Sequence, residues 1–125
     1  MDSLGLYFAV AAAVVLFYGW KKFQTRGIPQ YTPAQARERV AAGSMLLDVR
    51  TAAERKQSSI AGSLHIPLND LPVKMKTLEK FRTREVIVYC ASGSRSSSAA
   101  VQLKKAGFSA GNLTGGIGAW NYANL

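Results

Sequence analysis

The stretch of this sequence best suited to chemistry is Tyr89 to Ser98, which reads Tyr-Cys-Ala-Ser-Gly-Ser-Arg-Ser-Ser-Ser. It follows an apolar run at 85–89 and leads into a helix-like stretch at 98–106. A loop that passes from a strand into a helix turns several backbone N–H groups inward, and the helix N-terminus adds roughly half a positive charge. A thiol held there is stabilised as its thiolate. We therefore expect the pKa of Cys90, the only cysteine, to lie below its ordinary value of about 8.5, which makes Cys90 a candidate nucleophile.

The residues around Cys90 fit a loop built for that purpose. Gly93 supplies the backbone freedom that closes the loop, and the serines at 96–98 are candidate caps for the helix. Arg95 suits a clamp that fixes the loop or meets an anionic sulfur donor. A lone cysteine is usually a small buried apolar residue, but such a residue needs neither a glycine loop nor an arginine five positions later. The candidate active loop comprises catalytic Cys90 with Ala91, Ser92, Gly93, Ser94, Arg95 and Ser96.

The elements that must position this loop alternate along the chain. The apolar runs 44–49 and 86–89 predict buried strands, with shorter strands starting at Tyr31 and covering 64–66. The stretch 107–113 predicts a weak last strand, because Gly111 provides no side chain to pack within it. Helices are expected from Thr32–Pro33 to about residue 42, at 52–56, at 69–80 with an interruption at Pro72, and at 98–106.

This alternation indicates an α/β fold with a small, mainly parallel sheet and helices on both faces. Ligands of such sheets bind at the carboxyl ends of the strands, where the pattern places both Asp48 and Cys90. The Gly115–Gly116 turn and Trp120 are expected to be structural, the first for backbone geometry and the second for packing of a closing helix. His65, the only histidine, is expected to be structural or to support the site indirectly.

Four motifs in this order resemble those of the rhodanese family, over roughly residues 30 to 122. The active loop of that family reads Cys-x-x-Gly-x-Arg followed by Ser or Thr, and Cys90, Gly93, Arg95 and Ser96 match it. The other three matches are 46–50 with Glu54, 60–68, and 115–117 with Trp120. The resemblance implies a rhodanese-like fold. It also implies that Asp48, Arg50 and Glu54 support the site, with Glu54 as the first candidate for the carboxylate that orients Arg95.

An apolar segment precedes the candidate domain. Residues 4–20 carry no charge, and as a helix they would rise about 26 Å, close to the thickness of a bilayer core. Lys21, Lys22 and Arg26 follow the segment, whereas only Asp2 precedes it. This asymmetry predicts a single-pass anchor in the cytoplasmic membrane with the catalytic domain on the cytoplasmic side. A cleaved signal peptide is the main rival, but no small-x-small cleavage site follows the segment. We divide the chain into an anchor at 1–23, a linker at 24–30 and a rhodanese-like domain at 31–125.

Composition excludes several other classes of function. One cysteine and one histidine cannot build a zinc site within one chain, and we expect neither a metal nor another cofactor. The net charge of +9 favours anionic neighbours such as small oxyanions or acidic lipids. Nucleic acid is not an expected partner, because the basic residues are spread without an aromatic-studded strip. No second cysteine can resolve a persulfide on Cys90, so the sulfur must pass to another molecule.

These features favour a membrane-tethered sulfurtransferase of the rhodanese type. In this hypothesis Cys90 takes sulfane sulfur from a donor such as thiosulfate or a persulfide and passes it to a thiol, cyanide or a protein acceptor. A binding or sulfur-relay module without turnover of its own is the alternative. Phosphatase or arsenate reductase chemistry fits less well, because the related cell-cycle phosphatases have five residues between cysteine and arginine, whereas Cys90 and Arg95 enclose four. A loop of that size suits one sulfur atom better than a tetrahedral oxyanion.

Overall fold

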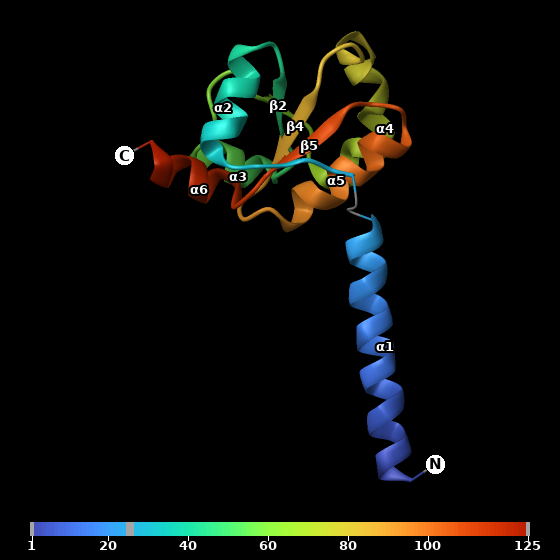
Figure 1. Ribbon diagram of the computed structural model, residues 1–125. Coiled ribbons are helices and arrows are strands. Elements are labelled where there is room, and N and C mark those ends of the chain that lie inside the picture. The colour runs from blue at the N-terminus through green and yellow to red at the C-terminus, as the bar shows by residue number, and fades with distance from the viewer. Residues whose placement is uncertain (1, 25–26, 125) are drawn as a thin grey trace.

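The computed structural model describes residues 2–24 and 27–124 (Figure 1). The α-helices are α1 (Ser3–Gln24), α2 (Pro33–Ala41), α3 (Ala52–Gln57), α4 (Leu71–Lys74), α5 (Ser94–Lys105) and α6 (Gly116–Ala123). The strands are β1 (Gln30–Tyr31), β2 (Met45–Asp48), β3 (Leu64–His65), β4 (Val86–Tyr89) and β5 (Ala110–Leu113). Two 3₁₀ segments, η1 (Leu68–Asp70) and η2 (Met75–Phe81), flank α4.

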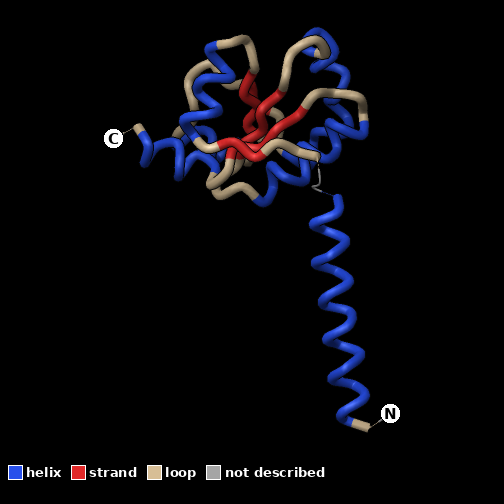
Figure 2. Tube along the Cα trace, in the orientation of Figure 1, coloured by secondary structure: helices blue, strands red, loops and turns tan. Residues whose placement is uncertain are grey.

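The five strands lie together in one sheet, drawn in red in Figure 2. Their order is β1-β5-β4-β2-β3, and every pair is parallel. Asp48 at the end of β2 lies in register with Tyr89 at the end of β4. The residues that follow these two strands therefore leave the sheet at the same edge, which is the usual position of a binding site in a parallel sheet. The predicted α/β fold is confirmed.

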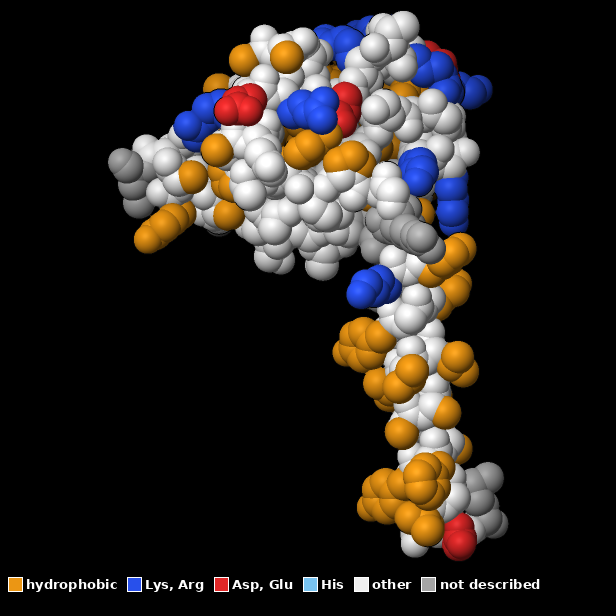
Figure 3. Space-filling model, in the orientation of Figure 1, with side chains coloured by type: hydrophobic (Ala, Val, Ile, Leu, Met, Phe, Trp, Pro, Cys, Tyr) orange, Lys and Arg blue, Asp and Glu red, His pale blue; other side chains and the backbone are white. Residues whose placement is uncertain are grey.

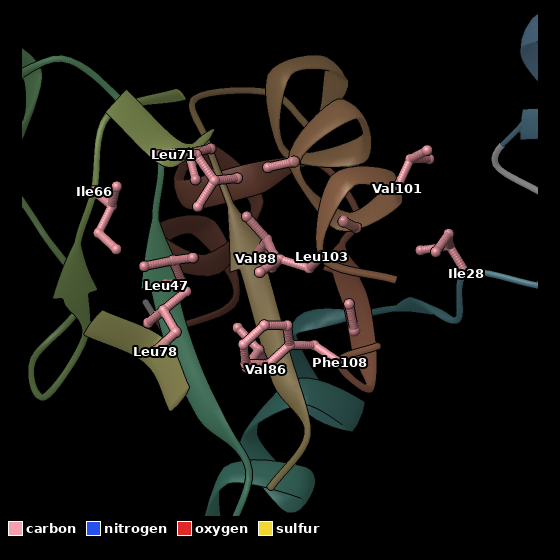
Figure 4. Packing of buried hydrophobic residues seen from close by; sticks show 14 of the residues in the cluster. Ile28, Leu47, Ile66, Leu71, Leu78, Val86, Val88, Val101, Leu103 and Phe108 are labelled. Atoms are coloured by element: carbon pink, nitrogen blue, oxygen red, sulfur yellow. The ribbon is translucent and has the colours of Figure 1, made fainter. Parts of the chain in front are cut away.

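The core has two halves because successive residues of the central strands point to opposite faces. Leu47, Val86 and Val88 pack on one face with residues of α4 and α5, among them Leu71 and Leu103 (Figure 4). A second cluster on the other face joins the sheet to α2 and α6 and contains Leu46, Ile87, Tyr89, Ala36 and Ile117. All residues of β2 and β4 are buried, as expected for strands covered by helices on both sides.

Local sequence explains where two of the helices begin. Thr32 caps α2: its side chain accepts a hydrogen bond from Gln35 N, Gln35 Oε1 accepts one from Thr32 N, and Pro33 occupies the first turn. Thr51 and Glu54 make the same reciprocal pair at the start of α3. Each pair satisfies two backbone N–H groups that have no partner within the helix.

Two helix predictions need correction. Helix α5 begins at Ser94 rather than Ser98, and its N-cap is Gly93, so none of the three serines at 96–98 is the cap. The region 69–80 is helical but divided into 3₁₀ and α pieces, and Pro72 lies in the first turn of α4 instead of interrupting a longer helix. Proline is tolerated there because the N–H that it lacks would have no partner in that turn.

Strand β5 pairs with β1 on one side and β4 on the other, so the strand predicted to be weak lies inside the sheet. Gly111 is needed there, because a Cβ atom at this position would lie 2.6 Å from Cε2 of Tyr31. The aromatic ring occupies the space that a side chain would take. Ile28, within the segment predicted as a linker, is 5 % exposed and belongs to the core, where Figure 4 shows it facing Val101.

Helix α1 contains an 18-residue apolar window, Ser3–Trp20, whose mean hydropathy is 1.8, and none of that window is buried (Figure 3). Its length and composition are sufficient to cross a membrane, although a signal sequence near the N-terminus would have the same properties. Of the three basic residues predicted to follow the span, Arg26 and the side chain of Lys21 lie outside the described part of the chain.

Candidate active site

The loop after β4 wraps around the thiol of Cys90. The thiol accepts a hydrogen bond from Gly93 N at 3.0 Å and lies 3.3 Å from the hydroxyl oxygen of Ser96. Gly93 has φ +116°, a backbone conformation that glycine adopts without strain and other residues rarely adopt. No side chain caps α5, so its first N–H groups remain available to the sulfur rather than to a capping oxygen.

The environment of Cys90 lowers its pKa. Burial by itself raises the pKa of the thiol, but hydrogen bonds from the Ser96 hydroxyl and from the N–H groups of Ser96, Gly93 and Ser92 together outweigh it. The net effect is a pKa below the ordinary value, which raises the fraction of Cys90 present as thiolate at any given pH. The residue is only 1 % exposed, so the sulfur sits at the bottom of the loop.

The backbone of the loop is held from the other side by the start of α6. Ile117 N donates to Cys90 O at 2.9 Å, and Gly118 N donates to Ala91 O at 3.4 Å. A Cβ atom on Gly116 would lie 2.4 Å from Cys90 O, so only glycine permits this close approach. The Gly115–Gly116 turn therefore supports the loop directly as well as providing a turn.

Arg95 and Glu54 form a two-pronged ion pair across the mouth of the loop. Arg95 Nη1 donates to Glu54 Oε1 at 2.7 Å and Nη2 donates to Glu54 Oε2 at 2.8 Å. The contact expected between these two residues is thus present, 41 positions apart in the sequence. Hydrogen bonds from Arg95, with further ones from Thr51, lower the pKa of Glu54 to about 2. Arg95 thereby ties the first turn of α5 to the first turn of α3.

Asp48 and Arg50 belong to a buried polar cluster that follows β2. Asp48 is fully buried and accepts hydrogen bonds from Arg50 N, Nε and Nη2 and from Arg55 Nη1. Burial raises the pKa of Asp48, but the Arg50 bonds outweigh it and keep the carboxyl below its ordinary range. Arg50 Nη2 also donates to Ser58 O at 2.6 Å, and His65 Nε2 lies 2.7 Å from Arg50 O. These contacts hold the segment between β2 and β3 in place. The expectation that Asp48 and Arg50 support sulfur chemistry stays a prediction.

Sequence reasoning missed the buried hydrogen bonds of two polar side chains, of which only the first lies beside the Cys90 loop. Asn112 on β5 is 3 % exposed, and its Oδ1 lies 2.5 Å from Ser96 Oγ. Tyr89, directly before Cys90, lies with its hydroxyl 2.8 Å from Ser63 Oγ and accepts from Ile60 N. The available signal for Asn112 was a polar residue in the middle of a strand, which must find hydrogen bonds when buried.

A pocket of about 100 Å³ adjoins the arginine side of the loop. Its walls combine apolar and uncharged polar side chains with a single charged one, and they comprise Val49, Thr51, Pro67, Leu68, Asn69 and Arg95. This space is large enough for a few non-hydrogen atoms. Arg95 is the residue of the active loop that lines this pocket, and Cys90 does not line it.

Comparison with known proteins identifies the family. The chain belongs to the rhodanese-like domain family, whose model matches residues 32–123. A sulfurtransferase of Allochromatium vinosum is 40 % identical over 77 residues, which are 61 % of this chain and 70 % of that protein. YtwF of Bacillus subtilis, which is named as a candidate sulfurtransferase, is 35 % identical over 95 residues. These residues are 74 % of this chain and 90 % of that protein.

A solved structure has the same fold. The rhodanese-related protein of Thermoplasma volcanium superimposes with a TM-score of 0.71 at 34 % identity, covering 78 % of this chain and 94 % of that one. The resemblance seen in the sequence motifs is therefore confirmed at the level of the family. Family and relatives together support sulfur transfer in general as the activity of the chain.

Proposed function

We propose that the chain carries sulfane sulfur as a persulfide on Cys90. The thiolate attacks the outer sulfur of a donor such as thiosulfate or a persulfide. A bond forms between Sγ and that sulfur while the donor's own bond to it breaks, and the remainder of the donor, sulfite in the case of thiosulfate, leaves with the electron pair. An acceptor nucleophile then attacks the outer sulfur, and Cys90 is released as thiolate.

The observation that carries this proposal is the position of Sγ inside a ring of hydrogen-bond donors. Gly93 N–H and the Ser96 hydroxyl point at the sulfur, and the backbone N–H groups of Ser92 and Ser96 also lower the thiol pKa. The same groups are placed to stabilise a negative charge on the outer sulfur of a persulfide.

The ion pair of Arg95 argues against a phosphate or arsenate group as the ligand of the loop. Both terminal nitrogens of Arg95 are engaged by Glu54, so the guanidinium is turned to a carboxylate instead of being presented to a phosphate or arsenate. Phosphatase chemistry normally uses both terminal nitrogens of the arginine to bind the phosphate group. Sulfur transfer does not, because backbone amides suffice for a single sulfur atom.

The acceptor in this proposal is a small thiol, cyanide or a cysteine of another protein. The pocket beside Arg95 has a volume of about 100 Å³, which favours small donors and acceptors or one side chain of a protein partner. With one cysteine in the chain, discharge of the persulfide requires such a second molecule.

Mass spectrometry after incubation with thiosulfate or a low-molecular-weight persulfide tests the chemistry. We expect the intact protein to gain the mass of one sulfur atom, the modification to map to Cys90, and added cyanide or thiol to remove it. The matched control is Cys90→Ser, which should remain folded and unmodified because a serine hydroxyl is neutral at working pH. Absence of the added mass with both donors would contradict the proposal.

We further propose that α1 anchors the domain on the cytoplasmic side of the cytoplasmic membrane, with residues 1–23 as the anchor and 31–125 as the catalytic domain. Support comes from the exposed apolar window of α1 and from the basic residues that follow it in the sequence. A lone thiol also stays reduced on that side.

Thiol labelling of intact cells tests the topology. The variant carries Thr25→Cys together with Cys90→Ser, and intact cells are treated with a membrane-impermeant thiol reagent. Thr25 lies outside the described residues. We expect labelling only after lysis. Efficient labelling before lysis would place the domain on the other side of the membrane.

A further inference from the structure

The hydroxyl of Ser96 faces three acceptors and has one proton to give. Its oxygen lies 3.3 Å from Cys90 Sγ, 3.1 Å from Gly93 O and 2.5 Å from Asn112 Oδ1. A serine hydroxyl can donate a single hydrogen bond at a time. The group that receives this proton determines how strongly Ser96 supports a negative charge on Cys90.

Gly93 O depends least on the Ser96 proton, because Ser97 already donates hydrogen bonds to it. Ser97 N donates to Gly93 O at 3.2 Å and Ser97 Oγ donates to it at 2.9 Å. The competition for the Ser96 proton is therefore between Cys90 Sγ and Asn112 Oδ1. Asn112 is 3 % exposed, and a buried oxygen without a donor is costly.

The side-chain amide of Asn112 is held in one orientation. Its Nδ2 donates to Gln30 Oε1 at 2.8 Å and to Ser97 Oγ at 3.2 Å. Ser97 gives its own proton to Gly93 O, so its oxygen is an acceptor toward Asn112. Gln30 Nε2 lies 3.4 Å from Ile28 O, which turns Gln30 Oε1 toward Asn112. Both partners of Nδ2 thus place Oδ1 against Ser96.

We propose that Asn112 is a positioning residue that competes with Cys90 Sγ for the proton of Ser96. When Cys90 is a thiolate, the hydroxyl turns to the sulfur and leaves Asn112 Oδ1 without this donor. When Sγ is neutral, the hydroxyl turns to Asn112 at the shorter distance. Asn112 therefore stabilises the neutral forms of Sγ relative to the thiolate.

One consequence rests on the proposed function. In a persulfide the negative charge lies on the outer sulfur and Sγ is neutral, so Ser96 can donate to Asn112 while the loop N–H groups hold the outer sulfur. Asn112 would then favour loading of Cys90 over the free thiolate. The rotation of one hydroxyl is the only change required, and no proton leaves Ser96.

The pH profile of Cys90 alkylation by iodoacetamide tests this competition in the full chain. Asn112→Leu frees the Ser96 hydroxyl for the sulfur, so the midpoint of the alkylation profile should move to lower pH. Below that midpoint, alkylation should accelerate about fivefold, which corresponds to the free energy of one ordinary hydrogen bond. Ser96→Ala should act in the opposite direction, with alkylation slowed about fivefold. A purely structural role of Asn112 would not produce opposite shifts at these two positions.

The charged groups around Cys90 stay unchanged in these variants. Arg95 interacts electrostatically with Cys90 and with Asp48, and Glu54 neutralises Arg95. Neither Asn112→Leu nor Ser96→Ala alters these charges. A changed midpoint therefore reports on the hydroxyl.

A second variant keeps the test decisive if Asn112→Leu fails to fold. Gln30→Met removes the acceptor that orients the Asn112 amide, at an exposed position, and should accelerate alkylation about twofold in the same direction. Gln57→Met, an equally neutral change at an exposed position of α3, is the matched control and should leave the profile unchanged. An unmoved or raised midpoint in a folded Asn112→Leu variant, or an unmoved midpoint in Gln30→Met, would overturn the proposal. Alkylation needs no sulfur transfer, so this result is independent of the proposed activity.

Discussion

The ion pair of Arg95 and Glu54 should contribute to sulfur transfer by fixing the shape of the loop. Two charge-assisted hydrogen bonds of 2.7 and 2.8 Å join the residues, but their side chains remain 36 % and 32 % exposed. Solvent reduces the value of such a pair to about 1 kcal/mol, which corresponds to roughly a fivefold change in rate. We expect Glu54→Gln and Arg95→Lys each to lower kcat/KM about fivefold, because a neutral amide or an ammonium cannot keep the planar pairing.

The assay is a double-mutant cycle on sulfur transfer from thiosulfate to cyanide. If the two residues act through one contact, the double variant should lose little more than either single variant, with a coupling energy of about 1 kcal/mol. Glu79→Gln is the matched control, because Glu79 forms a similar two-pronged pair with Arg82 outside the active loop. Additive losses at Arg95 and Glu54 would refute the pairing argument and would make Asp48 the next carboxylate to test.

Three further predictions concern the loop and the sheet. Gly116→Ala should slow persulfide formation on Cys90 at least tenfold in a stopped-flow assay, because the new Cβ would meet Cys90 O at 2.4 Å and push the loop aside. Gly111→Ala should lower the free energy of unfolding in urea by about 1 to 3 kcal/mol through its clash with Tyr31 while the loop stays intact. Since the pKa of Glu54 falls from 4.5 to about 2 on folding, its contribution is present above pH 4.5 and is lost as the pH falls through about 2. Melting temperatures should therefore drop more steeply over this range in the native protein than in Glu54→Gln.

Local sequence was sufficient to predict most elements. Helix caps and runs of apolar residues act within a few positions of the chain. They were sufficient to predict the start of α2 at Thr32–Pro33, the strands β2 and β4, and the position of Cys90 after β4. The motifs also identified the family, because they report the chemistry of one loop and its supports.

The start of α5 and its N-cap residue could not be predicted from the same rules. Three serines suggested a cap at 96–98, yet Gly93 takes this place with a positive φ and leaves the first N–H groups to Cys90. In an ordinary cap, a side-chain oxygen accepts hydrogen bonds from the first N–H groups of the helix. Here the end faces a buried sulfur, and the hydrogen bonds to that sulfur compete with the ordinary cap.

Cysteine position, loop composition and fold class were set by the sequence alone, because each depends on residues close together in the chain. Only the tertiary structure placed Asn112 of β5 against Ser96 of α5 and gave the two-pronged geometry of the expected pair between Glu54 of α3 and Arg95. Parallel strands bring together residues that lie tens of positions apart, and the strand order β1-β5-β4-β2-β3 decides which of them meet. The contact between Arg95 and Glu54 was expected from family resemblance, whereas the hydrogen bonds of Asn112 had no local signal beyond a polar residue in a buried strand.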